Sequence, residues 1–284
     1  MQELTLAEVV HALDGLYPPS TAASWDRVGL VTGDPEQPVR RIHLAVDATL
    51  AVVQEARDAG ADLLVTHHPL LLRGVHSVAT TTAKGAAVTA LVVGDVALYV
   101  AHTNADVATP GVCDALATAI GLHDLTPLAE VEGQALGRVG ELPAEESLGD
   151  FARRLAGALP AAPGGIRVAG PAQGRVRRVA VVGGAGDDMF DAVRASGADV
   201  YVTADLRHHP VLEAREESRG GTPYLVDAGH WATESVWLTS VEERLRGALA
   251  AAGEPGTTVV THISTLRTDP WEFVVGAEAP GGMS

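Results

Sequence analysis

The stretch VRRIHLAVDATLAVVQEARDAGADLLVT, residues 39–66, is followed 137 positions later by a second version of itself, VRRVAVVGGAGDDMFDAVRASGADVYVT, residues 176–203. Without a gap, the two copies share Val39/Val176, Arg40/Arg177, Arg41/Arg178, Ala48/Ala185, Arg57/Arg194, Gly60/Gly197, Ala61/Ala198, Asp62/Asp199, Val65/Val202 and Thr66/Thr203. Each copy runs from an apolar segment through an amphipathic stretch and a Gly-Ala-Asp stop to a second apolar segment, which predicts strand, helix, strand. The sequence therefore predicts an α/β protein of two similar lobes that arose by internal duplication.

The two copies continue differently. The first runs into Thr66-His67-His68-Pro69, whereas the second runs into Thr203-Ala204-Asp205. Ligands of open α/β sheets usually bind beyond the carboxyl ends of the strands. The histidine pair at the end of the first copy is therefore the first candidate for a functional site.

Length and composition set the domain count. A chain of 284 residues is long enough for two ordinary domains, each with its own core. The segment from 129 to 174 is rich in Gly, Pro and Ala and is the expected boundary. We predict a first α/β lobe over residues 1–128 and a second over 129–284, with the C-terminal part packing back on the first.

Charge and cysteine usage exclude several classes of function. A net charge of -16 opposes extended contact with nucleic acid or an anionic membrane surface. The longest apolar stretch, 85–101, is interrupted by Gly94-Asp95 and is too short to cross a bilayer. The start of the chain lacks the pattern of a secretory signal, and the single cysteine, Cys113, has no partner for an internal disulfide. We expect a cytoplasmic protein.

Outside the repeats, periodicity and capping residues predict further elements. Helices are expected over residues 5–13, 82–93, 111–121, 147–159, 210–217 and 232–251. Strands are expected over residues 96–101, 224–226 and 258–263, with one short strand between 129 and 174. The polar segment His102-Thr103-Asn104-Ala105-Asp106 directly follows the strand over 96–101.

Histidines and carboxylates gather at these strand and helix ends. His67 and His68 are adjacent, so their side chains point to opposite sides and suit two neighbouring ions better than one. His230 and Glu234 are spaced i, i+4, about 5 to 6 Å apart at Cβ on one helix face, and Asp106 adds another oxygen. Without thiolates, this set favours zinc, manganese or iron with positions left for water. The composition is typical of a catalytic dinuclear centre.

Each feature also has a simpler interpretation. His230 and Glu234 alone could form a surface ion pair, and Asp106 could be a turn or capping residue. The second histidine pair, His208-His209, is either a solvated helix start or a group near the substrate. The stretch Val182-Gly183-Gly184-Ala185-Gly186 either offers free amides to a phosphate or forms a tight turn that needs small residues.

Several motifs occur here in a fixed order, namely Trp25-Asp26-x-Val28-Gly29-Leu30, Thr66-His67-His68-Pro69-Leu70, His102-Thr103-Asn104-x-Asp106, Thr203-x-Asp205, Gly229-His230-x-x-x-Glu234 and Thr268-Asp269-Pro270. In this combination the chain resembles the dinuclear-metal-centre hexameric protein family, whose members are often labelled GTP cyclohydrolase 1 type 2 homologues. The resemblance implies two intertwined α/β lobes with the metal site in the cleft between them. It implies a toroidal homohexamer, a trimer of dimers.

The resemblance also implies the ligands of two divalent ions per subunit: His67, His68, Asp106, His230 and Glu234, with Glu234 bridging. Two features depart from the family. Arg27 stands where members usually carry Asn, and a domain that some members insert between the lobes is missing. The task of Trp25 and Asp26 does not follow from the sequence, so neither is placed in the predicted site.

Hydrolysis is the reaction class that such a centre favours, because divalent ions lower the pKa of bound water towards about 7. We predict a hydrolase acting on a nucleotide or related heterocycle, which the family label would narrow to opening the guanine ring of GTP. His102 or His209 would move protons at the cleft mouth. The alternative is a non-enzymatic metal-binding or regulatory protein, and a third possibility, a hub for partner proteins, would need an exposed apolar patch.

Overall fold

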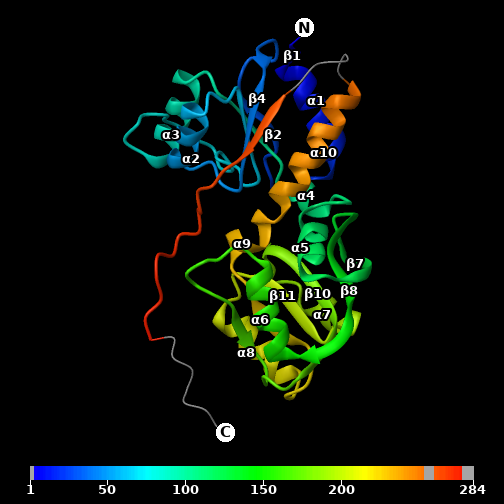
Figure 1. Ribbon diagram of the computed structural model, residues 1–284. Helices are drawn as coiled ribbons and strands as arrows, with labels where there is room; N and C mark the ends of the chain where they lie inside the picture. Colours follow the sequence, from blue (N-terminus) through cyan, green and yellow to red (C-terminus); the bar gives the residue numbers. More distant parts are fainter. Residues whose placement is uncertain (1–2, 253–258, 277–284) are drawn as a thin grey trace.

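The computed structural model describes residues 3–252 and 259–276. Two large sheets, each covered by helices, form two lobes that lie one above the other in Figure 1, and residues 4–5 pair with residues 38–39 in a further two-stranded sheet. The strands are β1 (Leu4–Thr5), β2 (Gly29–Thr32), β3 (Pro38–Val39), β4 (Arg41–Ala45), β5 (Leu63–Thr66), β6 (Ala97–Val100), β7 (His123–Val131), β8 (Gln134–Ser147), β9 (Arg167–Ala169), β10 (Arg175–Ala185), β11 (Val200–Ala204), β12 (Tyr224–Asp227) and β13 (Val260–Ile263).

The helices connect these strands and cover both sheets. They are α1 (Leu6–Leu16), η1 (Pro19–Thr21), α2 (Leu50–Asp58), α3 (Ala83–Val93), α4 (Thr103–Val107), α5 (Val112–Ile120), α6 (Leu148–Ala158), α7 (Phe190–Ser196), α8 (His208–Glu217), α9 (His230–Ser235) and α10 (Trp237–Ala252). None of the helices within the described ranges is long and apolar enough to span a membrane.

The first sheet has the strand order β13-β4-β5-β6-β2. Neighbours from β13 to β6 are parallel, and β2 runs antiparallel to β6 at the edge. One face packs against α1 and α10 through a cluster that includes Leu13, Leu44 and Val241. The other face packs against α2 and α3 through Val52, Leu64 and Leu91.

The second sheet has the strand order β7-β8-β10-β11-β12-β9. Its centre, β10-β11-β12, is parallel, and the flanking strands are antiparallel. The aromatic ring of Phe151 on α6 and the side chain of Leu116 on α5 pack against one face. On the other face, Val193 of α7 and Ala214 of α8 lie against Tyr201.

The two repeats form strand–helix–strand units of the same register. In β4 and β5, Ile42 pairs with Leu63, and in β10 and β11, the equivalent Val179 pairs with Val200. Burial of the β-branched and leucine side chains on both faces explains why these runs are almost continuously apolar. The predicted strand, helix and strand are therefore present in both copies, and the fold is mixed α/β.

The sequence prediction is incomplete in several places, since neither β2 nor α4 was expected. Two larger discrepancies concern longer elements. The single helix predicted over 232–251 is broken at Val236 into α9 and α10. Trp237 at the break is fully buried, and its Nε1 donates a hydrogen bond to the Tyr17 hydroxyl at 3.1 Å. The bend between the helices thus places a large ring in the core of the first lobe.

The second discrepancy is the long hairpin of β7 and β8, of which only one short strand was expected. The glycines and prolines of this hairpin interrupt the alternation of apolar and polar residues that predicts strands. Gly137, with φ of +68°, is needed because β7 and β8 approach each other closely there. A Cβ there would lie 2.9 Å from the Leu128 side chain. The predicted boundary at 128/129 falls inside β7. The division into lobes of residues 1–128 and 129–284 stays a prediction. The start of the strand predicted over 258–263 lies outside the described residues.

The chain crosses between the lobes more than once. After the second sheet is complete, α9 and α10 lead back to the first lobe, where β13 pairs in parallel with β4 (Figure 1). Elements from both lobes therefore meet at the junction, where β5, α4 and α9 bring their polar residues.

Candidate metal centre

The five predicted ligands come together at the junction of the lobes. His67 and His68 follow β5, Asp106 lies on α4, and His230 and Glu234 lie on α9. The carboxylate of Glu234 is in the middle: its oxygens lie 3.5 Å from His67 Nε2, 3.0 Å from His68 Nε2 and 3.0 Å from His230 Nε2. His67 Nε2 also lies 3.6 Å from Asp106 Oδ1. One carboxylate thus faces three imidazoles, as a bridging ligand would.

In each of these three imidazoles, Nδ1, the nitrogen that points away from Glu234, lies at hydrogen-bond distance from an acceptor oxygen. Nδ1 of His67 lies 2.9 Å from the carbonyl oxygen of Ala101. Nδ1 of His68 lies 2.7 Å from Asp47, and Nδ1 of His230 lies 2.8 Å from Asp205. Each acceptor requires a proton on Nδ1. When a ring is neutral, its Nε2 therefore carries the lone pair, and this lone pair faces the centre. Metal-binding histidines in proteins show this arrangement.

Three buried polar atoms at the centre have ion-pair neighbours but form no hydrogen bond within the described ranges. These atoms are His67 Nε2, Asp106 Oδ1 and Glu234 Oε2. A buried polar group without a hydrogen bond costs free energy, so such atoms gather where something else binds. Nitrogen and carboxylate donors without thiolates suit zinc, manganese or iron. The residues present therefore fit divalent metal ions.

The pKa values of the same groups show how strongly the centre favours positive charge. Burial tends to raise the pKa of Glu234, but His67 and His68 outweigh it and hold that pKa well below its usual range. Burial tends to lower the pKa of His68 and His230, but the adjacent carboxylates outweigh it, mainly Glu234 for His68 and Asp205 and Glu234 for His230. The resulting values are about 10 for His68 and about 11 for His230. The raised pKa values favour protonated His68 and His230 at neutral pH in the metal-free protein, and metal binding would release these protons.

A glycine of the second repeat makes room for Glu234. Gly184 in β10 has φ of +67°, and a Cβ on it would lie 2.2 Å from Glu234 Oε1 and 3.1 Å from His230 Nε2. Its amide already donates a hydrogen bond to Thr233 Oγ1 at 3.0 Å. This amide is therefore not free for a phosphate. The tight turn predicted as the alternative is also not found, because residues 182–185 lie within β10, but a small residue is needed at position 184 for space.

His102, predicted to move protons, lies beside the centre. One nitrogen atom each from His102, His67 and His68 lie within 4.8 Å of one another. Its Nδ1 is 3.0 Å from both carboxylate oxygens of Asp26, which also accepts hydrogen bonds from the amide and hydroxyl of Thr103. Hydrogen bonds from His102 and Thr103 hold the pKa of Asp26 far below its usual range, although burial alone would raise it. Asp26 thus orients His102.

His209, the second residue predicted to move protons, is placed differently. It lies in the exposed first turn of α8, where its ring contacts that of His208 at 5.1 Å between centroids. It does not line the cavity beside the centre. The solvated helix start is the interpretation that this position favours.

Sequence reasoning missed the residues that support the ligands: Asp26, Asp47, Asp205 and Gly184. Signals for some of them were present. Asp26 and Asp205 belong to the motifs that carry the family resemblance. When the two repeats are aligned at the offset of 137, Asp205 is the equivalent of His68, and Gly184 is the equivalent of Asp47. Only the fold shows that Asp47 approaches His68 from β4's end of the sheet.

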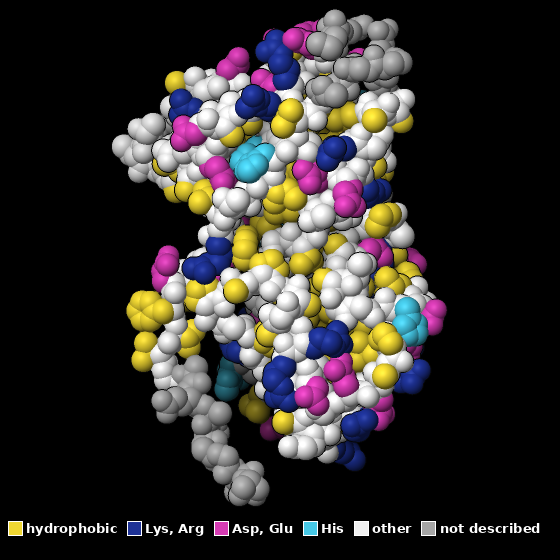
Figure 2. All heavy atoms as spheres, in the orientation of Figure 1, with side chains coloured by type: hydrophobic (Ala, Val, Ile, Leu, Met, Phe, Trp, Pro, Cys, Tyr) yellow, Lys and Arg dark blue, Asp and Glu magenta, His cyan; other side chains and the backbone are white. Residues whose placement is uncertain are grey.

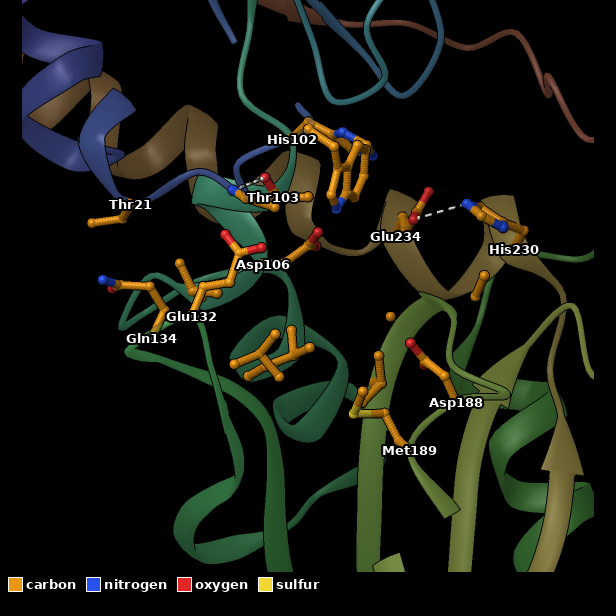
Figure 3. Close-up of a pocket in the computed structure, with 18 residues that line it drawn as sticks. Thr21, His102, Thr103, Asp106, Glu132, Gln134, Asp188, Met189, His230 and Glu234 are labelled. Atoms are coloured by element: carbon orange, nitrogen blue, oxygen red, sulfur yellow. Dashed lines mark hydrogen bonds and ion pairs between the residues drawn. The ribbon is translucent and has the colours of Figure 1, made fainter. Parts of the chain in front are cut away.

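A cavity of about 310 Å³ opens beside the centre (Figure 3). Its wall includes His102, Asp106, His230 and Glu234, so a molecule in the cavity would touch the candidate ligands. The remaining wall comes from η1, the turn between β7 and β8, and the end of β10, with the residues Thr21, Ala23, Trp25, Thr103, Val107, Val131, Glu132, Gln134, Leu136, Val182, Gly183, Ala185, Asp188 and Met189.

Fold and site together define a two-lobed α/β protein with a candidate metal centre of histidines and carboxylates at the lobe junction. Comparison with protein families gives the particular group: residues 4–270 match the Duf34/NIF3 (NGG1p interacting factor 3) model, and the chain belongs to this family.

Curated relatives agree with this assignment. A Streptomyces coelicolor protein named GTP cyclohydrolase 1 type 2 homolog is 49% identical over 97% of this chain and 96% of its own length. A Mycobacterium tuberculosis protein of the same name is 35% identical over 94% of this chain and 97% of its own length. That alignment spans 377 positions, more than the 284 residues here, so the relative carries inserted residues that this chain lacks.

Solved structures show the same fold. A Bacillus cereus protein related to NIF3 superposes with a TM-score of 0.86 at 26% identity, covering 96% of this chain and all of the other. A Staphylococcus aureus hypothetical protein superposes with a TM-score of 0.87 at 27% identity, again over 96% of this chain.

Proposed function

We propose that this protein is a metal-dependent hydrolase that acts on a nucleotide or related heterocycle. The observation that carries the proposal is the set of buried metal-ligating atoms without a hydrogen bond on His67, Asp106 and Glu234, because Asp106 and Glu234 also line a cavity. Two divalent ions, of zinc, manganese or iron, would be held by His67, His68, Asp106, His230 and Glu234. The relatives' name supports the substrate class, and GTP cyclohydrolase chemistry is its most specific form.

When bound, the ions would supply Lewis acidity and activate water for attack. The chain's own residues do the rest. Asp47 and Asp205 fix the orientation of His68 and His230. His102 is placed by Asp26 at the cavity wall, where its imidazole can accept or donate a proton next to a bound substrate. A role for His209 in proton transfer remains a prediction.

A turnover screen tests this proposal. The protein is loaded with zinc, manganese or iron and incubated with nucleoside triphosphates, nucleosides and phosphoesters, with and without chelator. We expect turnover that chelator abolishes and that Glu234→Gln lowers at least a hundredfold. His123→Ala is the matched control, because His123 is an exposed imidazole paired with Asp124 on β7. Equal turnover in Glu234→Gln and the wild type would contradict the proposal.

A non-enzymatic metal-binding or regulatory protein is the second candidate. The same buried donors favour it equally, since a carrier also needs histidines and carboxylates. Reversible binding of ions without turnover on any substrate would favour this candidate. The remaining proposals are a cytoplasmic location, a homohexamer built as a trimer of dimers, and an origin of the two lobes by duplication. The shared register of the repeats supports the last of these.

A further inference from the structure

The cavity beside the candidate centre has an unusual charge distribution. Besides the imidazoles of His102 and His230, its ionisable lining consists of four carboxylates, Asp106, Glu132, Asp188 and Glu234, and no Lys or Arg is among its described lining residues. Two divalent ions at the centre would bring four positive charges, more than the two negative charges of Asp106 and Glu234. Glu132 and Asp188 are not among the candidate ligands, so their negative charge disfavours phosphate on their side of the cavity and throughout the metal-free protein. Phosphate sites in proteins usually offer arginine, lysine or free helix amides instead.

Much of the uncharged part of the wall is apolar, and it includes an aromatic ring. Val131, Leu136, Val182 and Met189 line it, together with Trp25, whose side chain is 56% exposed. The Trp25 ring lies edge-on to His102, with 5.9 Å between the ring centroids. Indole rings stack on flat heterocycles, and the thioether of methionine adapts to aromatic surfaces. This wall suits a planar ring system.

Two carboxylates are available to recognise amino groups on such a ring. Asp188 forms no hydrogen bond or ion pair with other described side chains or amides, and Figure 3 shows it with Met189 on the segment after β10, on the side facing Glu234. Glu132, at the turn between β7 and β8, accepts hydrogen bonds from the Ser24 amide and hydroxyl at 2.8 and 2.9 Å. This contact joins the two lobes across the cavity mouth. A carboxylate has about four lone-pair sites, so Glu132 retains acceptor capacity.

We propose that this cavity binds an uncharged planar heterocycle with amino or ring N–H groups, at the level of a nucleobase or nucleoside, and that it discriminates against triphosphates. Trp25 and Met189 contact the ring, and Asp188 accepts its N–H groups. Asp188 and Glu132 repel phosphate. This inference rests on the proposed function because it concerns the same centre. It keeps the heterocycle as the substrate class and excludes the GTP form of the reaction, and because it concerns binding it can be tested without turnover.

Direct binding to the metal-loaded and the metal-free protein tests the inference. Guanosine, adenosine and cytidine carry amino groups, inosine and uridine lack the exocyclic amino group, and GTP, ATP and CTP add the phosphates. Titration calorimetry should show at least one amino nucleoside binding tenfold or more tightly than its own triphosphate. Tighter binding of the triphosphates, or no binding of any nucleoside, would overturn the inference.

Variants of neighbouring aspartates identify the residue responsible. Asp188→Asn should weaken nucleoside binding at least tenfold, and Asp188→Lys should also narrow or reverse the preference over the triphosphate. Asp187→Asn is the matched control, because Asp187 pairs with Arg207 and does not line the cavity. Equal effects at positions 187 and 188 would contradict the role of Asp188. A protein that binds nucleosides as expected but shows no turnover would leave this inference standing and remove the hydrolase proposal.

Discussion

The two repeats share a scaffold and differ at their ends. In both, an aspartate after the helix ties the incoming strand: Asp62 Oδ2 accepts hydrogen bonds from the amides of Arg40 and Arg41, and Asp199 Oδ2 accepts them from those of Arg177 and Arg178. Gly60 and Gly197, at equivalent places, have φ of +67° and +69°. These shared residues build the strand–helix–strand unit and do not contact the candidate centre.

The residues that differ between the repeats form the centre. His68 of the first repeat has Asp205 as its equivalent in the second, and Asp47 has Gly184. In the first lobe the aspartate supports a histidine of its own repeat. In the second lobe the aspartate supports His230 from α9, and the glycine leaves space for Glu234. One end thus supplies ligands, while the other supplies support for ligands that arrive on a separate helix.

The largest expected effect comes from making the first repeat end like the second. His67→Ala gives position 67 the residue found at its equivalent, Ala204. We expect loss of at least one bound ion per chain, because His67 Nε2 is a buried donor facing both Asp106 and Glu234. Elemental mass spectrometry measures the ion content, and circular dichroism checks the fold. Full ion content in this variant would break the comparison.

A pair of glycine variants separates space for the ligand from backbone strain. Gly184→Ala should lower metal affinity at least tenfold, because the new Cβ would clash with Glu234 Oε1. Gly197→Ala imposes a similar left-handed strain, about 1–2 kcal/mol, with no neighbour within 4 Å of the new Cβ. Competition with a chromogenic chelator measures the affinity, and thermal unfolding measures the strain. Similar affinities in the two variants would show that Gly184 serves only the backbone.

The supporting aspartates should have smaller effects on metal binding. Asp47→Asn and Asp205→Asn each replace a carboxylate that accepts the Nδ1 proton of a ligand histidine. Loss of such a partner typically lowers metal affinity about 10- to 100-fold. Comparable losses in the two variants, measured by the same competition, would sharpen the view that the repeats support their histidines alike. Unchanged affinity in one of them would restrict this support to the other lobe.

The shared scaffold residues should not affect the metal at all. Asp62→Ala and Asp199→Ala each remove an acceptor for two backbone amides, which should lower the free energy of unfolding by about 1–3 kcal/mol. Because the lost bonds are equivalent, the two shifts in thermal midpoint should be similar. Ion content per folded chain should stay that of the wild type. A loss of ions from either variant would mean that the scaffold and the centre are not separate.

The same division explains what could be predicted from the sequence. The strands and helices of both repeats follow from local periodicity. The same is true of α3 outside the repeats, which begins where Thr82 offers its hydroxyl as the N-cap. The five candidate ligands could be selected because histidines and carboxylates at strand and helix ends are few. The aspartates that orient the histidines could not be predicted. Asp26, Asp47 and Asp205 contact their histidines across sequence separations of 21 to 76 residues, which only the folded chain brings together. The break before Trp237 likewise depends on burial against Tyr17.

The measurement that tests the account most directly is the metal stoichiometry of the wild-type protein after loading with zinc, manganese or iron and removal of free ions. Elemental mass spectrometry should find two divalent ions per chain, held by the histidine pair at the end of the first repeat together with residues of α4 and α9. A protein that retains no ions under these conditions would contradict the assignment of His67, His68, Asp106, His230 and Glu234 as a metal centre.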